Sequence, residues 1–170
     1  MQESLELVEN VFTASEGEAS GKLVRTLVGE IRSKRFYLPE LDLVMVDEQD
    51  QVIGYAMFSR FHLEGRYENQ LLLLSPVAVK TELQRQHISK ELIEAGFEKA
   101  AAMGYEAVLV EGNPKNYNPR GFETSYPHGI VAGPKIHLPA VECMMVKELV
   151  KGSLEHIRGI VDYSDYECLS

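Results

Sequence analysis

The sequence predicts a single α+β domain, residues 1–170, built around a strand–helix–strand unit. Two observations predict this fold class. The hydrophobic pattern changes from a helical period to a strand period near residue 40. A helix-period stretch with a strand-like run on each side then follows between residues 71 and 111. The chain has 170 residues, of which 45% are hydrophobic and 25% charged, so it is long enough to bury a substantial core.

The N-terminal 40 residues favour two helices. Apolar residues recur at helical spacing within residues 5–12 and again within residues 23–31. The polar, glycine-containing stretch from Thr13 to Ser20 predicts a loop between them, with Ser20 as a candidate N-cap of the second helix.

Three strand-like runs come next. Leu41 to Asp47 and Val52 to Phe61 flank the polar turn EQDQ, which predicts an antiparallel hairpin. A third strand is expected from Leu71 to Val79, with Ser75-Pro76 inside it. Because proline removes a hydrogen bond from the ladder, this pair predicts a bulge or an edge.

A third helix is predicted from about Gln86 to Met103, and Gly104 is expected to end it. The residues predicted to form its apolar face are Ile88, Leu92, Ala95, Gly96, Ala100 and Met103. The β-branched run from Tyr105 to Glu111 then predicts a buried strand parallel to the one before the helix.

The C-terminal third is less regular. Residues 112–122 predict a loop or short helix, and the following stretch to about Pro139 is rich in proline and glycine. A late strand is predicted from Glu142 to Leu149, a helical turn from Leu154 to Arg158 and a short strand from Ile160 to Tyr163.

Charge and composition exclude several function classes. With 17 basic and 26 acidic residues the net charge is −9, which argues against a nucleic-acid-binding surface. The five histidines lack metal-ligand spacing, and the two cysteines form no CxxC pair, so no metal site is expected. The apolar runs are too short for a bilayer and MQESLELVENVF lacks signal-peptide features, so no membrane partner and a cytoplasmic location are expected.

The segment between the third strand and the third helix is a candidate anion site. Strand-end and helix-start amides converge there, and the helix dipole adds partial positive charge, so a pyrophosphate could bind without a basic cluster. A bulge at Pro76 would also free backbone groups to pair with an extended, amide-bearing ligand. The alternative is an ordinary helix start that holds only water.

A second candidate is VEGNPKNYNPRGF, residues 110–122, at the same carboxyl end of the sheet. A phenol at Tyr117 could donate a proton to a leaving group. The alternative is a tyrosine that covers the core with its hydroxyl in water.

At these residues the chain resembles the GNAT superfamily of N-acetyltransferases. The branch it resembles has a strand ending in L-x-P-x-A-V that leads into Q-x-x-G-x-G, and a later strand that leads into G-D-P-x-Y-Y-x-R-F-G-F. The matching segments here are LLLLSPVAV, QRQHIS and GNPKNYNPRGF. The resemblance implies a mixed, mostly antiparallel sheet whose central parallel pair splays around the cofactor, with flanking helices and the first strand missing or truncated. The uncovered sheet edge leaves pairing into a homodimer open.

The resemblance also implies roles for residues. The backbone of Val77, Ala78 and Val79 would pair with the pantetheine arm of acetyl-CoA, the co-substrate. Tyr117 would protonate the departing thiolate while an amine attacks the thioester directly. The residues implied to hold the pyrophosphate are Gln84, Arg85, Gln86, His87, Ile88 and Ser89.

The chain departs from the family pattern in the pyrophosphate loop, where His87 and Ser89 stand in place of glycines. An imidazole there could block the pyrophosphate, swing outward or donate to it. Asn113 replaces the aspartate of the later motif, and Asn116 replaces the first of its two tyrosines.

The acceptor is expected to be a small-molecule or protein amine, and the acidic net charge favours a cationic one. Glu111 is the first candidate for a general base, with a solvated strand-end carboxylate as the alternative. His62 and Glu64 lie in a turn that could line the acceptor site. Two alternatives to an enzyme remain: a degenerate CoA-binding or interaction module, and a structural protein that shares only the fold.

Overall fold

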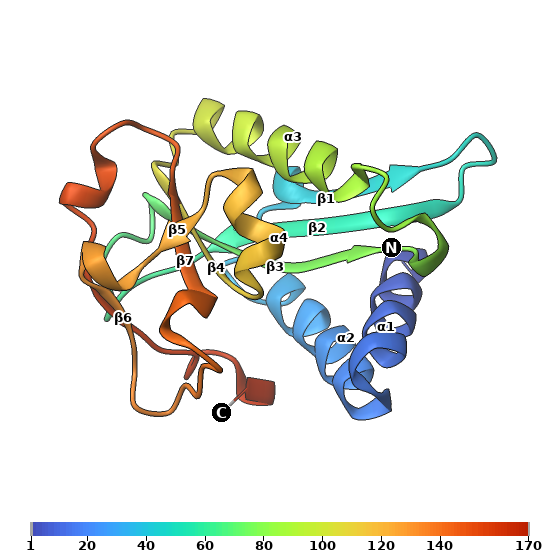
Figure 1. Ribbon diagram of the computed structural model, residues 1–170, viewed down its shortest axis with the longest axis horizontal. Helices are drawn as coiled ribbons and strands as arrows, with labels where there is room; N and C mark the ends of the chain where they lie inside the picture. Colours follow the sequence, from blue (N-terminus) through green and yellow to red (C-terminus); the bar gives the residue numbers. More distant parts are fainter. Residues whose placement is uncertain (1, 170) are drawn as a thin grey trace.

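The computed structural model describes residues 2–169 and contains a six-stranded sheet with helices on both faces (Figure 1). The strand order is β1-β2-β3-β4-β7-β5, and every neighbouring pair is antiparallel except β3 and β4, which run parallel. This confirms the predicted α+β class with its central parallel pair. The strands are β1 Asp42–Val46, β2 Val52–Arg60, β3 Leu71–Val79, β4 Ala107–Glu111, β5 Glu123–Thr124 and β7 Met144–Glu148.

Two helices, α1 Gln2–Glu16 and α2 Glu18–Arg32, cover one face of the sheet (Figure 1). The predicted loop from Thr13 to Ser20 is therefore wrong, because only Gly17 separates the helices. Its φ of 100° lets the chain reverse within one residue. Gly17 is also the N-cap, while Ser20 Oγ donates to Glu16 Oε1 at 3.2 Å.

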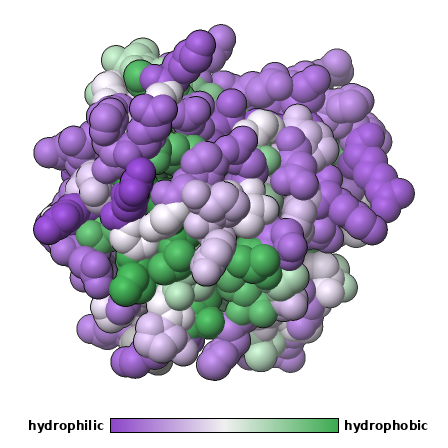
Figure 2. Space-filling model, turned by 60° about the vertical axis from the view of Figure 1, so that its left-hand side comes forward, coloured by the Kyte–Doolittle hydropathy of each residue, from purple (hydrophilic) through white to green (hydrophobic). Residues whose placement is uncertain are grey.

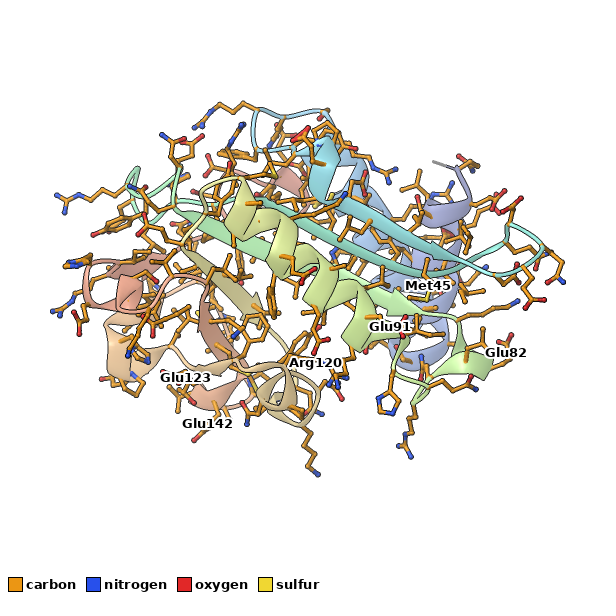
Figure 3. All side chains as sticks on the ribbon, turned by 90° about the horizontal axis from the view of Figure 1, so that it is seen from above. Met45, Glu82, Glu91, Arg120, Glu123 and Glu142 are labelled. Carbon is orange, nitrogen blue, oxygen red and sulfur yellow. The ribbon has the colours of Figure 1, made fainter. Side chains whose placement is uncertain are left out.

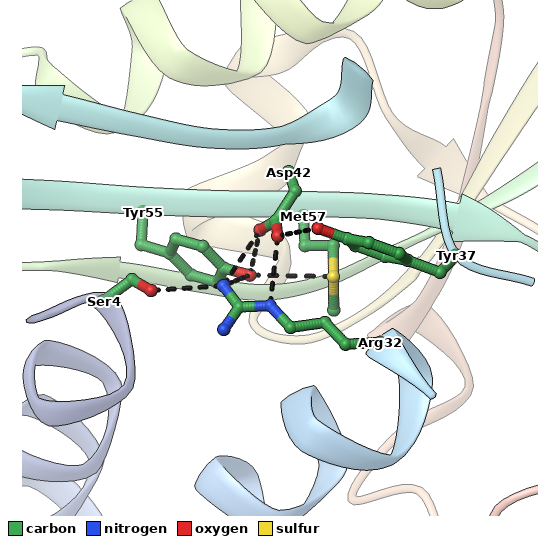
Figure 4. A network of polar contacts seen from close by, with 6 residues as sticks. All are labelled: Ser4, Arg32, Tyr37, Asp42, Tyr55 and Met57. Atoms are coloured by element: carbon green, nitrogen blue, oxygen red, sulfur yellow. Dashed lines mark hydrogen bonds and ion pairs between the residues drawn. The ribbon is translucent and has the colours of Figure 1, made fainter. Parts of the chain in front are cut away.

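A buried polar network ties these helices to the sheet (Figure 4). The guanidinium of Arg32 donates from Nε to Asp42 Oδ2 at 3.0 Å and from Nη2 to Ser4 Oγ at 3.1 Å. Asp42 also accepts hydrogen bonds from the hydroxyls of Tyr37 and Tyr55. Only 12% of the Arg32 side chain and 5% of the Asp42 side chain are exposed, so the ion pair is largely removed from water.

The predicted bulge in β3 is confirmed. Val77 pairs with Ala56 and Leu74 with Phe58, so both Ser75 and Pro76 stand opposite Met57. Because of the extra residue, the side chains that follow the bulge point to the opposite face of the sheet from the one that regular alternation would give. Before the bulge Leu73 packs into the core under α1 and α2, whereas after it Val77 packs on the α3 side.

Helix α3, Ile88–Ala102, covers the opposite face of the sheet (Figure 1). It begins later than the predicted Gln86, because Arg85 and His87 have φ values of 67° and 65°, outside the right-handed helical region. The predicted end at Gly104, with a φ of 94°, is confirmed.

The apolar face of α3 differs from the prediction at two positions, since Ala95 and Met103 are exposed. The buried residues are Leu92, Ile93, Gly96 and Ala100. Gly96 allows close packing of helix and sheet, because a Cβ at this position would lie 2.1 Å from the ring of Phe58.

The C-terminal part corrects several boundaries. Strand β4 begins at Ala107 rather than Tyr105, and the predicted helical turn is a 3₁₀ turn at Ser153–Glu155. The stretch expected to be irregular contains β5 and β6, Ile130–Ala132. The predicted strand near Ile160 is β8, Gly159–Val161, and it pairs in parallel with β6 in a second, two-stranded sheet. Neither β5 nor β6 was predicted, because both are too short for a period to be recognised.

Three further observations describe the molecule as a whole. In the described part of the chain no strand precedes α1, and β1 forms one edge of the main sheet. No helix within residues 2–169 is long and apolar enough to cross a membrane. Figure 2 shows that apolar residues gather on the lower half of one face, amid an otherwise polar surface.

Candidate functional site

The sheet opens between its two parallel strands. Strands β3 and β4 pair only from Leu71 to Leu73 and from Ala107 to Leu109, and beyond these residues they separate. On the other side of β3, Ala78 pairs with Tyr55 of β2. Because backbone groups alternate along a strand, the N–H and C=O groups of Val77 and Val79 point away from β2, toward the opening.

A cavity of about 530 Å³ lies at this opening. It brings together the end of β3, the start of α3 and the segment that follows β4. The predicted cofactor-binding residues that line it are Val77, Ala78, Val79, Gln84, Arg85, His87, Ile88 and Ser89, together with Tyr117. Gln86 is exposed and does not line the cavity.

Free backbone amides lie at the start of α3. The first turn of any helix leaves its amides without intrahelical acceptors, here those of Ile88, Ser89 and Lys90. Within residues 2–169 no backbone hydrogen bond is donated by the amides of Arg85 or His87 either. These donors and the helix dipole make a suitable environment for an anion at this end of the cavity.

His87 is the N-cap residue of α3 and makes no side-chain capping bond. Its φ of 65° and ψ of 14° lie in the left-handed region, where glycine is favoured because it has no Cβ. The side chain is exposed at the cavity lining. Histidine thus keeps the backbone conformation that a glycine would adopt, and it adds a ring beside the free amides.

We expect His87→Gly to bind acetyl-CoA several-fold more tightly, because the variant keeps the backbone conformation and removes the ring. Its effect on the free energy of unfolding should stay within about 1 kcal/mol, since relief of the left-handed strain is offset by greater freedom of the unfolded chain. Titration calorimetry measures the affinity, and His87→Ala, which removes the ring but keeps Cβ, is the matched control. Weaker binding by both variants would show instead that the imidazole holds the pyrophosphate.

The cavity is positively charged although the chain is acidic overall. Arg85, Lys115 and Arg120 line it, and no aspartate or glutamate of the described residues does so. The Nε atom of Arg120 is buried and has no hydrogen-bond partner within residues 2–169. Figure 3 shows Arg120 beside the N-terminal half of α3. The sequence analysis did not identify Lys115 and Arg120 as lining residues. Their positions on either side of Tyr117 were the signal that could have indicated a positively charged site.

Tyr117 closes one side of the cavity. It ends the short helix α4, Pro114–Tyr117, which Asn113 caps by accepting a hydrogen bond from the Lys115 backbone N–H at 3.0 Å. Its ring packs edge-on against Phe122, and Gly112 makes room for it, because a Cβ at Gly112 would lie 2.6 Å from the ring. Burial raises the pKa of Tyr117 to about 12, so the phenol stays protonated at neutral pH and can donate.

Glu111 lies on the other side of the opening. Ala107 and Leu109 pack under α1 and α2, so by alternation the last residue of β4, Glu111, projects from that same face. It lines a second cavity, of about 340 Å³, together with Ser75 of the β3 bulge. Tyr117 and Glu111 therefore stand on opposite faces at the end of β4. His62 and Glu64 line neither cavity.

Comparison with known proteins gives consistent results. The model of the Acetyltransferase (GNAT) family matches residues 8–122. The uncharacterized N-acetyltransferase YhbS of Escherichia coli K12 is 30% identical over 152 residues, which cover 89% of this chain and 84% of YhbS.

Solved structures agree. A crystal structure of Escherichia coli YhbS in complex with CoA superimposes with a TM-score of 0.77 at 28% identity, covering 94% of this chain and 83% of that one. A GNAT family acetyltransferase from Brucella melitensis in complex with acetyl-CoA has a TM-score of 0.58 at 23% identity, covering 72% and 79%, and shows the shared fold.

Proposed function

Because the chain belongs to the GNAT acetyltransferase family, we propose that it transfers an acetyl group from acetyl-CoA to an amine acceptor by direct attack. The observation that carries this proposal is the positively charged cavity at the splayed strands. In a chain of net charge −9, Arg85, Lys115 and Arg120 surround free amides and no carboxylate of the described residues joins them.

The residues present fit the parts of acetyl-CoA. The free amides at the start of α3 and the neighbouring cations suit the pyrophosphate. The outward backbone groups of Val77 and Val79 suit the amides of the pantetheine arm, in the manner of an added strand. Gln84 Nε2 donates to Val79 O at 3.2 Å. This hydrogen bond breaks when the pantetheine arm binds, and an amide of the arm takes the place of Gln84.

The chemistry follows from the two faces of the opening. The neutral nitrogen of the amine attacks the thioester carbonyl, and backbone amides of β3 stabilise the oxyanion. The C–S bond then breaks, and the thiolate takes the phenolic proton of Tyr117. The proton lost by the amine passes to the carboxylate of Glu111 or to water, and solvent returns a proton to Tyr117.

Binding and turnover test the proposal separately. Calorimetry should detect acetyl-CoA binding that weakens as salt rises, since the cations of the cavity are screened. Thiol release in a panel of primary amines should then exceed release without an amine.

If millimolar acetyl-CoA produced neither heat of binding nor a thermal shift, the proposed acetyltransferase activity would be excluded. Binding without release of thiol in any amine would favour the alternative, a CoA-binding module that has lost catalysis along with the glycines at positions 87 and 89.

A further inference from the structure

The second cavity contains a side chain that contacts Glu111. This side chain comes from the C-terminal tail, the segment that follows β8. The phenol of Tyr163 donates to Glu111 Oε1 at 2.8 Å, although 52 positions separate the two residues. Burial, and then the carboxylate of Glu111, raise the pKa of Tyr163, so its phenol remains a donor. The opposite oxygen of Glu111 has no hydrogen bond within residues 2–169.

A carboxylate of α2 helps to fix the tail to the body of the molecule. Glu30 accepts hydrogen bonds from the backbone N–H groups of Glu167 at 2.7 Å and Cys168 at 3.1 Å, and from Lys34 Nζ at 2.6 Å. Burial alone would raise the pKa of Glu30, but these three donors outweigh it and hold the pKa at about 2. Tyr166 is 1% exposed and completes the attachment.

We propose that Tyr163 is a positioning residue that holds Glu111 toward the amine of the acceptor, which makes the C-terminal tail one wall of the acceptor site. This inference rests on the proposed function. Its geometry is specific: Ser75 lies at the bulge where β3 diverges from β4, and Glu111 ends β4. Tyr163 meets Glu111 from the tail within the same cavity. The cavity lies on the face opposite to Tyr117, so an amine approaching from it would reach the thioester carbonyl from the side away from the proton donor.

The lining of this cavity indicates which amines fit. Its apolar walls are Leu27, Leu73, Ile136 and Leu169, and the polar end holds Glu111 and Tyr163. Lys135 and His137 also line it, and both are exposed. A volume of about 340 Å³ suits a primary amine on a compact apolar body. Lys135 disfavours a second positive charge on that body.

A double-mutant cycle tests the proposal. Tyr163→Phe keeps the ring and removes the donor, so kcat/KM for an arylalkylamine such as phenethylamine should fall about tenfold, the size expected for a hydrogen bond to a charged group. The affinity for acetyl-CoA should not change. In the Glu111→Gln background, Tyr163→Phe should have no further effect, because the carboxylate that it positions is gone.

The outcomes of this cycle distinguish failure of the inference from failure of the proposed function. If Tyr163→Phe lowers kcat/KM equally in both backgrounds, or in neither, the inference is wrong while the proposed function stands. If the wild-type chain releases no thiol in any amine, the proposed function fails first. Tyr126→Phe, on an exposed side chain, should match the wild type. Should Tyr163→Phe not fold, Glu30→Gln loosens the tail from a site outside the cavity, and the same cycle with Glu111→Gln applies.

Discussion

Replacing Tyr117 with phenylalanine is expected to lower kcat for acetyl transfer about 100-fold, the lower part of the range for general acid catalysis. The effect lies in that part because a thiol, with an ordinary pKa of about 8.5, is already a fair leaving group. The KM for acetyl-CoA should change little, since the ring remains packed against Gly112 and Phe122.

Single-turnover measurement of thiol release separates this effect from product release. Tyr126→Phe is the matched control, because it makes the same change on a side chain that is 63% exposed and does not line the cavity. An unchanged single-turnover rate in Tyr117→Phe would remove the assigned role and assign the proton donor to water.

Replacing Arg32 with alanine is expected to reduce the free energy of unfolding by about 3 kcal/mol, because it leaves the buried carboxylate of Asp42 without its cation. The hydroxyls of Tyr37 and Tyr55 still donate to Asp42, which keeps the loss at the low end of the range for buried pairs. For a chain of this length such a loss corresponds to a melting temperature about 6–12 °C lower.

Chemical denaturation measures this loss, and Lys22→Ala is the control. Lys22 pairs with Glu18 at 2.7 Å, but the two side chains are 64% and 75% exposed, so its removal should leave the free energy of unfolding almost unchanged. The double variant Arg32→Met, Asp42→Asn should recover more than half of the loss, because it leaves no buried charge. A loss in Arg32→Ala no larger than in Lys22→Ala would show that the network contributes little.

Much of the fold was predictable because its signals are local. The period of the hydrophobic residues gave the hairpin, the strand at β3 and the third helix, and Pro76 marked the bulge. The errors arose where tertiary contacts decide. The chain turns between α1 and α2 at Gly17 alone, and β6 is a three-residue strand that exists because it pairs with β8.

The candidate site divides in the same way. The residues proposed to hold the pyrophosphate are close together in sequence, and Tyr117 lies in a second short motif, so motifs could identify both. Arg120 lies three positions after Tyr117, but only the structure shows that its Nε is buried without a partner among the described residues.

The sequence by itself determined the order of strands and helices, the bulge and the segments that meet at the splayed strands, since these follow from hydrophobic period, proline and motif. Tertiary structure alone decided the charge of the cavity, the placement of Glu111 and Tyr117 on opposite faces of the sheet, and the contact from Tyr163. The physical reason is that a side chain's face depends on the register of every preceding residue, and a bulge reverses it. Contacts across 52 positions depend on how the whole chain packs.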